Sequence, residues 1–226
     1  PGNAGGEGGG GRKLFGDGMD ATGCSPKRQL MLPHFYLACL WMLVAVFRTM
    51  YMLGTVRLQM VENGGGKTPA QADDLVRAFN WLILASSVIT PLFGRLMDVL
   101  GMSFAFFFVN TLGVFVFGAL HSSDFGLLYF AFVVFGCFRA WNYGAITAYA
   151  QSVFGGANFG RIYGVIGLFG ILASALQAPV IAISLQYLPE WGDFLPVNLT
   201  IEGCSALVYV FPAFIWWQGR REAPSG

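Results

Sequence analysis

The chain has few charged residues, which make up 11% of its 226 residues, against 55% hydrophobic residues and a mean hydropathy of +0.60. Soluble globular domains carry about 25% charged residues. The composition therefore excludes a soluble enzyme or binding module and indicates a membrane protein. The net charge is only +1, and the basic residues are scattered along the chain, so nucleic acid is not an expected partner.

Cysteine and histidine are also scarce, with four and two residues. No two cysteines form a C-x-x-C pair, and three of the four fall in apolar stretches where a buried thiol is ordinary packing. His34 and His121 stand alone at the ends of predicted helices, and we expect solvated side chains there rather than metal ligands. The sequence predicts no disulfide framework, no metal site and no cofactor.

The sequence lacks the alternation of apolar and polar residues that a membrane-spanning β-barrel requires, which excludes a barrel. It has long apolar stretches joined by short polar segments instead. A helix needs roughly 20 residues to cross about 30 Å of hydrocarbon. We therefore expect an all-α, polytopic membrane bundle of six transmembrane helices. The predicted spans are 31–53, 75–93, 102–120, 126–150, 160–185 and 199–218.

The predicted organisation is one membrane domain between two terminal segments. Residues 1–29 are rich in glycine and poor in bulky apolar side chains, which is typical of a flexible tail or linker. Residues 30–219 contain the six-helix domain, and residues 220–226 form a second tail. Because six crossings return the chain to its starting side, both tails lie on the same side of the membrane.

The lysine and arginine residues predict which side is cytoplasmic. Eight of the 13 fall on the side of the termini and three on the other side, while Arg48 and Arg139 lie within spans. Positive residues concentrate on the cytoplasmic side of membrane proteins, so we expect both ends to be cytoplasmic, in the plasma membrane or an internal membrane. The eight are Arg12, Lys13, Lys27, Arg28, Arg95, Arg161, Arg220 and Arg221, and the three are Arg57, Lys67 and Arg77.

Arg139 is the leading candidate for a functional residue, because it lies inside the apolar run Val133–Gln151. A charged arginine near the bilayer centre costs about 2.5–3.5 kcal/mol, so it should face a partner or a water-filled cavity. Asn142 and Tyr143 follow at helical spacing and are expected to share its face, while Trp141 points to lipid or to a neighbouring helix. These residues could bind a solute carboxylate through the guanidinium. The alternative is a structural arginine in a buried pair.

Other polar residues within the spans are weaker candidates. Gln177 precedes Pro179, which should kink the fifth span, and it either lines a solute path or makes an interhelical hydrogen bond. Arg48 falls near the external end of the first span, where snorkelling explains it about as well as a gate or a substrate contact. Asn110 and Thr111 carry the same ambiguity. Four glycines of the fifth span predict close helix packing rather than chemistry: Gly160, Gly164, Gly167 and Gly170.

The segment after the second span reads "GRLMDVLG" and contains Gly94, Leu96, Asp98 and Gly101. It resembles the cytoplasmic loop signature of the major facilitator superfamily, G-x-L-x-D-[RK]-x-G-[RK]-[RK], although Val99 replaces the basic residue after the aspartate. Glycines let helix ends approach, and the aspartate can accept hydrogen bonds at a neighbouring helix N-terminus, so the motif predicts a gate contact. The alternative is a tight turn with one solvated carboxylate.

Further pieces of the chain resemble one branch of that superfamily in their order. They look like the C-terminal six helices of the system L type large-neutral-amino-acid transporters of solute carrier family forty-three and their fungal and protist relatives. The resemblance covers about 170 residues, but Gly155 stands where the family usually has proline, and a long cytoplasmic insertion is absent. The pieces are "FRTMYMLGTV" (47–56), "PLFGRLMD" (91–98), Arg139 with "YGAITAY" (143–149), "VFGGANFGRIYG" (153–164), "ALQAPV" (175–180) and "PVN" (196–198).

The resemblance implies a facilitative uniporter for neutral or cationic amino acids that works by alternating access. Such transporters place the solute between two six-helix halves, so we expect a missing N-terminal half to precede Pro1. A nucleobase or another small organic solute is an alternative substrate, and a non-transporting structural bundle is an alternative role. Glu202 is the only acidic residue within a predicted span, near its external end. This poverty of acid–base groups argues against an enzyme and against obvious proton coupling.

Overall fold

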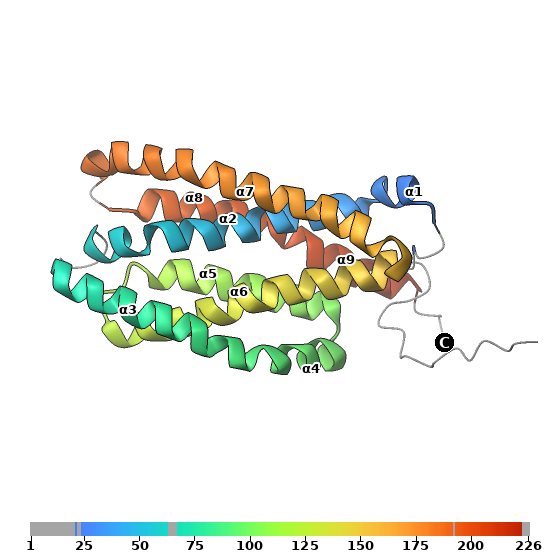
Figure 1. Cartoon of the computed structure of the whole chain (residues 1–226), viewed down its shortest axis with the longest axis horizontal. Coiled ribbons are helices and arrows are strands. Elements are labelled where there is room, and N and C mark those ends of the chain that lie inside the picture. The colour runs from blue at the N-terminus through green and yellow to red at the C-terminus, as the bar shows by residue number, and fades with distance from the viewer. Residues whose placement is uncertain (1–20, 22–23, 63–66, 192, 223–226) are drawn as a thin grey trace, which may run out of the picture.

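The computed structural model describes residues 21, 24–62, 67–191 and 193–222, and these form a helical bundle (Figure 1). No strand occurs within these ranges, so the predicted all-α class is confirmed. The helices are α1 (Pro26–Leu30), α2 (Pro33–Glu62), α3 (Pro69–Ser86), a 3₁₀ turn (Ser87–Ile89), α4 (Thr90–Leu100), α5 (Met102–Ala119), α6 (Phe125–Phe154), α7 (Gly156–Trp191), α8 (Leu195–Val208) and α9 (Val210–Glu222).

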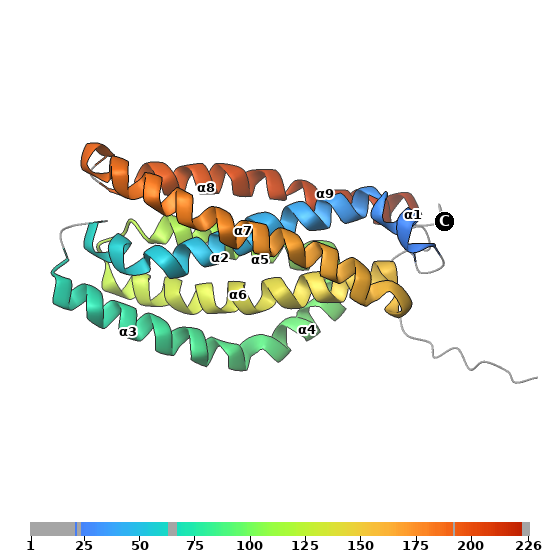
Figure 2. The same ribbon diagram turned by 45° about the horizontal axis from the view of Figure 1, so that its top comes forward.

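The long helices lie side by side along one common axis (Figures 1 and 2). α2 is central, because it packs along α7 and also contacts α3, α6, α8 and α9. α5 packs against α6, α8 and α9, and α3 packs against α6. α1, the start of α7 and the end of α9 lie at one end of the bundle, and the C-terminal ends of α2, α5 and α7 lie at the other (Figure 1). The described chain therefore begins and ends at the same end of the bundle.

The helices are long and apolar enough to make a multi-pass membrane protein. Within the described residues, five helical segments meet this description, with α8 and α9 counted together, and the bent pair α3 and α4 makes a sixth. The observed helices extend beyond several predicted spans. α2 continues to Glu62 and α7 to Trp191, each several residues past the predicted end.

Two of the crossings are interrupted next to a proline. The 3₁₀ turn separates α3 from α4 just before Pro91, and these two helices differ in direction by 55°. α8 ends at Val208, and Pro212 lies in the first turn of α9. A proline has no backbone N–H and its ring clashes with the carbonyl four residues earlier, which breaks the helix. Pro179 also lies inside a helix, but α7 continues through it without a break.

Glycine makes two of the turns between helices. α4 continues through Leu100, so residues 94–100 are helical rather than a loop, and Gly101 alone turns the chain into α5 with φ of +84°. Gly155 turns α6 into α7 with φ of +74°. This left-handed backbone is costly for any residue with a Cβ. Proline is held near φ of −65°, so it does not fit the Gly155 turn, where the resembling family usually carries it.

The packed part of the chain begins earlier than residue 30. Gln29 is fully buried, and its Nε2 donates hydrogen bonds to the carbonyls of Ala21 (2.7 Å) and Phe154 (3.0 Å). The Ala21 N–H donates to the Val153 carbonyl (2.9 Å). The end of the predicted 1–29 linker is therefore fastened to the end of α6, and α1 lies within it. Residues 1–20 and 223–226 lie outside the described residues.

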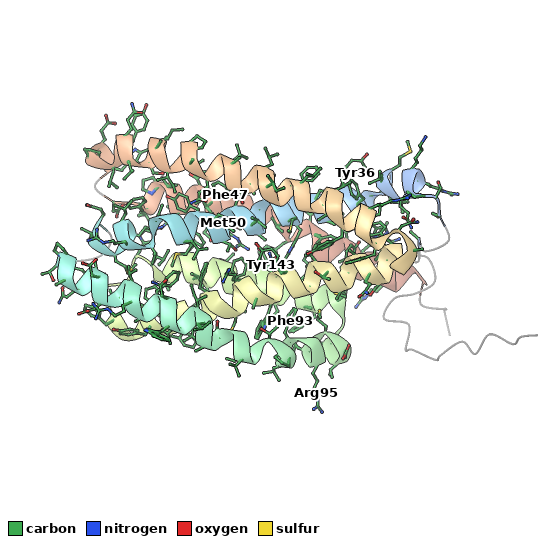
Figure 3. All side chains as sticks on the ribbon, viewed as in Figure 1. Tyr36, Phe47, Met50, Phe93, Arg95 and Tyr143 are labelled. Atoms are coloured by element: carbon green, nitrogen blue, oxygen red, sulfur yellow. The ribbon has the colours of Figure 1, made fainter. Side chains whose placement is uncertain are left out.

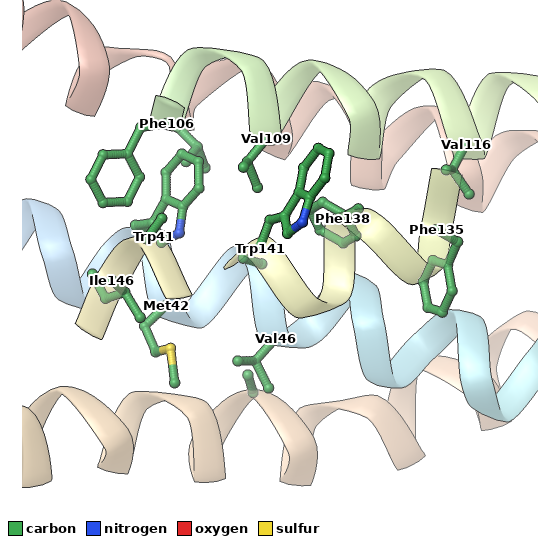
Figure 4. Packing of buried hydrophobic residues seen from close by; sticks show 14 of the residues in the cluster. Trp41, Met42, Val46, Phe106, Val109, Val116, Phe135, Phe138, Trp141 and Ile146 are labelled. Atoms are coloured by element: carbon green, nitrogen blue, oxygen red, sulfur yellow. The ribbon is translucent and has the colours of Figure 1, made fainter. Parts of the chain in front are cut away.

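Aromatic side chains fill the centre of the bundle (Figure 4). Trp41 of α2 meets Phe106 of α5 edge to face, with 4.7 Å between ring centroids. Trp141 of α6 stacks on Phe93 of α4 at 5.0 Å and 10°, so it points to neighbouring helices rather than to lipid. Such pairs add about 0.5–1.5 kcal/mol beyond the area they bury. These contacts fix the rotation of α6 and thereby decide which of its residues face outward.

Candidate functional site

A half-buried row of polar residues runs along α6 and meets α7. Arg139, Tyr143 and Thr147 are spaced by four residues, so they lie on one side of the helix. The Thr147 hydroxyl donates to the Tyr143 carbonyl (2.7 Å) and lies 3.1 Å from the Tyr163 hydroxyl of α7. Figure 3 places Tyr143 about halfway along the bundle, between α6 and α2. We call Arg139, Tyr143, Thr147 and Tyr163 the polar strip.

Arg139 lies at the middle of its helix. It follows Phe125 by 14 residues and precedes Phe154 by 15, which places it about 20 Å from either end at a rise of 1.5 Å per residue. The side chain is half-buried, and its Nε has no hydrogen-bond partner in the described chain. It interacts electrostatically with Tyr143. The guanidinium therefore retains an unused donor at mid-depth of the bundle.

Asn142 does not lie on the polar strip. It is fully buried, and its Oδ1 accepts a hydrogen bond of 2.6 Å from the Trp41 indole of α2. The Nδ2 atom is buried without a partner among the described residues. The expectation that Asn142 and Tyr143 share one face with Arg139 therefore holds for Tyr143 alone. A separation of three residues turns a helix by about 300°, which at this position is enough to point the side chain into the core.

Gln177 lies where α7 packs against α2. Its amide occupies the space left by Gly54, because a Cβ at that glycine would collide with Gln177 Nε2 and lie 2.9 Å from Ile181 Cδ1. The amide makes no hydrogen bond to the described residues, so the interhelical hydrogen bond considered from the sequence is not formed within them. Gln177 follows Tyr163 by 14 residues, or close to four helical turns, and lies on the same side of α7.

Arg48 is not at the end of its helix and does not snorkel. It lies near the middle of α2, and its side chain is fully buried. Its Nη2 donates to Asn110 Oδ1 of α5 at 2.8 Å, and its guanidinium lies 4.8 Å from the centre of the Phe138 ring. Gly113 makes room for this group, since a Cβ there would lie 2.7 Å from the guanidinium carbon. Arg48 Nε and Nη1 are buried without partners among the described residues.

Glu202 of α8 is the acidic residue that interacts electrostatically with Arg48. Both carboxylate oxygens are buried without a hydrogen-bond partner in the described chain. Asn110 Nδ2 donates to the Ser205 carbonyl of α8 at 3.1 Å and so joins α5 to the same helix. Arg48, Asn110 and Glu202 form what we call the buried cluster, between α2, α5 and α8. Thr111, by contrast, is exposed and lies 2.9 Å from the Tyr209 hydroxyl.

Sequence reasoning missed the electrostatic interaction of Arg48 with Glu202. Both were assigned to the external edge, because the first span was predicted to end at residue 53 and the sixth to begin at residue 199. The interaction could have been predicted from the sequence, because a charged side chain within a membrane span needs a nearby group of opposite charge. Apart from Arg139, the other charged residues inside the predicted spans, Arg77 and Arg161, lie within three residues of a span end.

The residues of the predicted gate motif lie on the surface of α4. Asp98 is exposed, and its carboxylate makes no hydrogen bond to the described residues. A Cβ at Gly94 would have no neighbour within 4 Å, so no other described helix approaches it closely. Leu96 is half-buried, and Gly101 forms the turn. The contact that the motif predicts is therefore not made with any residue that the structure describes.

The two histidines are both held by partners. His34 is buried, not solvated, and its Nδ1 lies 2.9 Å from the Tyr149 hydroxyl. His121 is half-buried between α5 and α6, and the Asn198 amide donates to its Nε2 at 3.0 Å and to Gln59 Oε1 at 2.9 Å. Burial lowers the pKa of His121 below its ordinary value, and the nearby Asp193 carboxylate opposes this shift. His121 is therefore neutral near pH 7.

The glycine row of α7 packs closely at one position only. A Cβ at Gly170 would lie 3.3 Å from Met42 Cε of α2. At Gly160, Gly164 and Gly167 a Cβ would have no neighbour within 4 Å, so the predicted close packing is wrong there. The first half of α7 therefore leaves an open side. Only 17% of the residues in the most apolar window of this helix are buried, against 50–56% for α2, α5 and α6.

Comparison with curated proteins finds a distant relative. The chain is 30% identical over 188 residues to Protein FMP42 of Saccharomyces cerevisiae, which covers 79% of this chain. The chain spans about a third of the length of that relative (35%). No known family matches the chain, and no solved structure matches it.

Proposed function

We propose that the chain is one six-helix half of a membrane transporter of the major facilitator type, which carries neutral or cationic amino acids by facilitated alternating access. The observation that carries the proposal is Arg139, a half-buried cation at mid-depth whose Nε is buried without a hydrogen-bond partner among the described residues. Intramembrane ionisable residues of this kind mark solute pathways by default. The sequence resemblance described above points to the same class.

The polar strip supplies the chemistry that a zwitterionic solute needs. The Arg139 guanidinium can pair with a carboxylate through two parallel N–H donors, and the Tyr143 and Tyr163 hydroxyls lie on the same strip. The apolar surface of α2 next to it can accept a side chain, as ligand pockets are mostly apolar with a few placed polar groups. In this proposal Gln177 adds an amide on α7 to the same lining.

The second half of the transporter is proposed to cover the side that carries the polar strip. The length relation supports this, because the chain matches only 35% of its yeast relative. The sparse burial of α7 supports it as well, since a helix this open requires lipid or another protein surface. Asp98, exposed at the end of α4, would then make its gate contact with the other half rather than within this one.

The end of the bundle with α1, Gly101, Gly155 and the end of α9 is proposed to be cytoplasmic. Arg95 and Arg161 lie near this end, and Lys27 and Arg28 of α1 and Arg220 and Arg221 of α9 add to it. The proposal is transport rather than an enzymatic reaction, in the plasma membrane or an internal membrane. A nucleobase or another small organic solute is the alternative cargo, because the tyrosines of the strip could equally stack on a planar ring.

Uptake into proteoliposomes tests the proposal. The full-length protein that its gene encodes is reconstituted, and uptake of labelled leucine, arginine and adenine is measured for the native protein and for Arg139→Gln. Arg161→Gln is the matched control, because Arg161 is exposed at the start of α7. We expect saturable uptake of one amino acid, reduced roughly tenfold or more in Arg139→Gln and unchanged in the control.

Three other outcomes separate the alternatives. Uptake of adenine alone would assign a nucleobase as the cargo. Absence of uptake of all three solutes by a correctly inserted protein would contradict transport of these classes. Equal uptake by the native protein and Arg139→Gln would remove Arg139 from the site and favour a structural arginine.

A further inference from the structure

A groove lies on the outer surface of the bundle between α5 and α9. Its volume is about 620 Å³, and its walls are formed by Phe104 and Phe107 of α5 and by Pro212, Ala213 and Trp216 of α9, with Tyr209 at one end. Phe104, Phe107 and Trp216 are each 42–52% exposed, so large apolar surfaces face outward here. Both walls belong to candidate membrane spans.

The polar groups that border the groove are already bonded to one another. The Ser103 hydroxyl donates to the Pro212 carbonyl at 2.7 Å. The Tyr209 hydroxyl lies 2.9 Å from the Thr111 hydroxyl. Pro212 has no N–H to offer. These residues present no unsatisfied polar atom to the groove. The groove therefore suits an apolar occupant.

A cation stands at one end of the groove. The Arg220 guanidinium lies over the Trp216 ring, with 4.0 Å between its central carbon and the ring centre. This stacking uses the face of the guanidinium and leaves its N–H edges for an anion. No ion pair of Arg220 occurs among the described residues. The end of α9 is thus a positive site at the membrane edge, joined directly to the groove wall.

The dimensions match one leaflet of a bilayer. Tyr209 and Arg220 are 11 residues apart, which corresponds to about 16 Å along α9. Half of a bilayer's hydrocarbon core is about 15 Å. A chain lying in the groove from Tyr209 to Trp216 would therefore bring its headgroup to the level of Arg220.

We propose that this groove is a binding site for a phospholipid with an anionic headgroup, whose acyl chain lies between α5 and α9 and whose headgroup meets Arg220. The occupant comes from the leaflet on the side where α9 ends. The site stands apart from the polar strip, which lies on α6 and α7, so it does not depend on the proposed transport function. Because α5 and α9 do not carry that strip, a bound lipid would not compete with a solute there.

Native mass spectrometry of the purified whole protein tests the site. Phosphatidylglycerol and phosphatidylcholine with identical acyl chains are added in equal amounts, and the lipid retained per protein is measured. Retention of phosphatidylglycerol should exceed that of phosphatidylcholine about fivefold, the contribution expected of one arginine near an anionic lipid. Arg220→Gln should remove this preference, and Arg161→Gln, on another helix, should keep it.

A second pair of variants tests the acyl-chain position. Ala213→Trp fills the groove and should abolish retention of both lipids, while Ala206→Trp, on an exposed position of α8 outside the groove, should not. Equal retention of the two lipids by the native protein, or a preference that persists in Arg220→Gln, would overturn the proposal. If Ala213→Trp fails to fold, the Arg220 comparison still decides it, because that side chain is exposed.

Discussion

The two arginines inside the spans are surrounded in opposite ways. Arg48 is fully enclosed, with Asn110, Gly113 and Phe138 shaped around it and Glu202 as its countercharge. Arg139 is half-buried at the middle of α6, and its Nε has no hydrogen-bond partner among the described residues. The same residue type at similar depth thus has two different environments. The enclosed contacts of Arg48 are those of a residue that holds the bundle together, whereas a ligand role for Arg139 remains our proposal.

Removing Arg48 should give the largest loss of stability. Arg48→Gln removes the positive charge that interacts with the buried Glu202 carboxylate, and leaving a buried charge uncompensated costs about 3–5 kcal/mol. We expect a strong decrease in the midpoint of thermal unfolding in detergent, or failure to insert. Arg139→Gln, measured alongside, should unfold close to the native temperature.

The double variant Arg48→Gln with Glu202→Gln sharpens this prediction. It removes both charges, so it should be more stable than Arg48→Gln alone. Additive losses in the double variant would show that the two side chains do not act as a pair.

Gly113→Ala should have the next largest effect. Its Cβ would lie 2.7 Å from the Arg48 guanidinium, which must then move away from Asn110. Overpacking of a tight core costs about 1–3 kcal/mol. Gly118→Ala is the matched control on the same helix, because its Cβ would have no neighbour within 4 Å. Equal unfolding temperatures of the two variants would contradict the enclosed position of Arg48.

A smaller effect is expected from pH. The pKa of His121 is lowered by burial, so the unfolded chain binds a proton more readily than the folded protein does. The contribution of neutral His121 to folding stability is therefore fully present above pH 6.5, the ordinary pKa of histidine. It is lost as the pH falls through the lower pKa of the folded protein. Protonated Nε2 can no longer accept from the Asn198 amide. Unfolding temperatures measured from pH 7.5 to 5 should fall more for the native protein than for His121→Gln.

Hydropathy was sufficient to predict the all-α class and the order of the membrane spans, but not the residues at which the helices end. The apolar pattern stops near residue 53, while α2 continues to Glu62 because Thr55, Gln59 and Arg57 are satisfied by partners on the same or neighbouring elements. This extension moves Arg48 from the edge to the middle. Gly94 and Asp98 indicated a loop by residue type, yet α4 runs through both, and only the positive φ of Gly101 makes the turn.

The site was predictable in part. The free-energy cost of a charged side chain in hydrocarbon singled out Arg139 as a candidate, and helical spacing placed Tyr143 beside it. They could not separate Asn142 from Tyr143, because positions three and four residues along a helix differ by only about 100°. The rotation of α6 is decided by the stacking of Trp141 on Phe93 of α4, a contact between segments far apart in the sequence.

Thiol labelling of two adjacent positions tests the open strip most directly. Tyr143→Cys and Asn142→Cys are made in the whole protein after all its native cysteines, Cys24, Cys39, Cys137 and Cys204 among them, are replaced by alanine, and each is treated with a charged thiol reagent. The account predicts labelling of Tyr143→Cys, slowed by the transported solute, and no labelling of Asn142→Cys. Labelling of both positions at similar rates, or of Asn142→Cys alone, would contradict it.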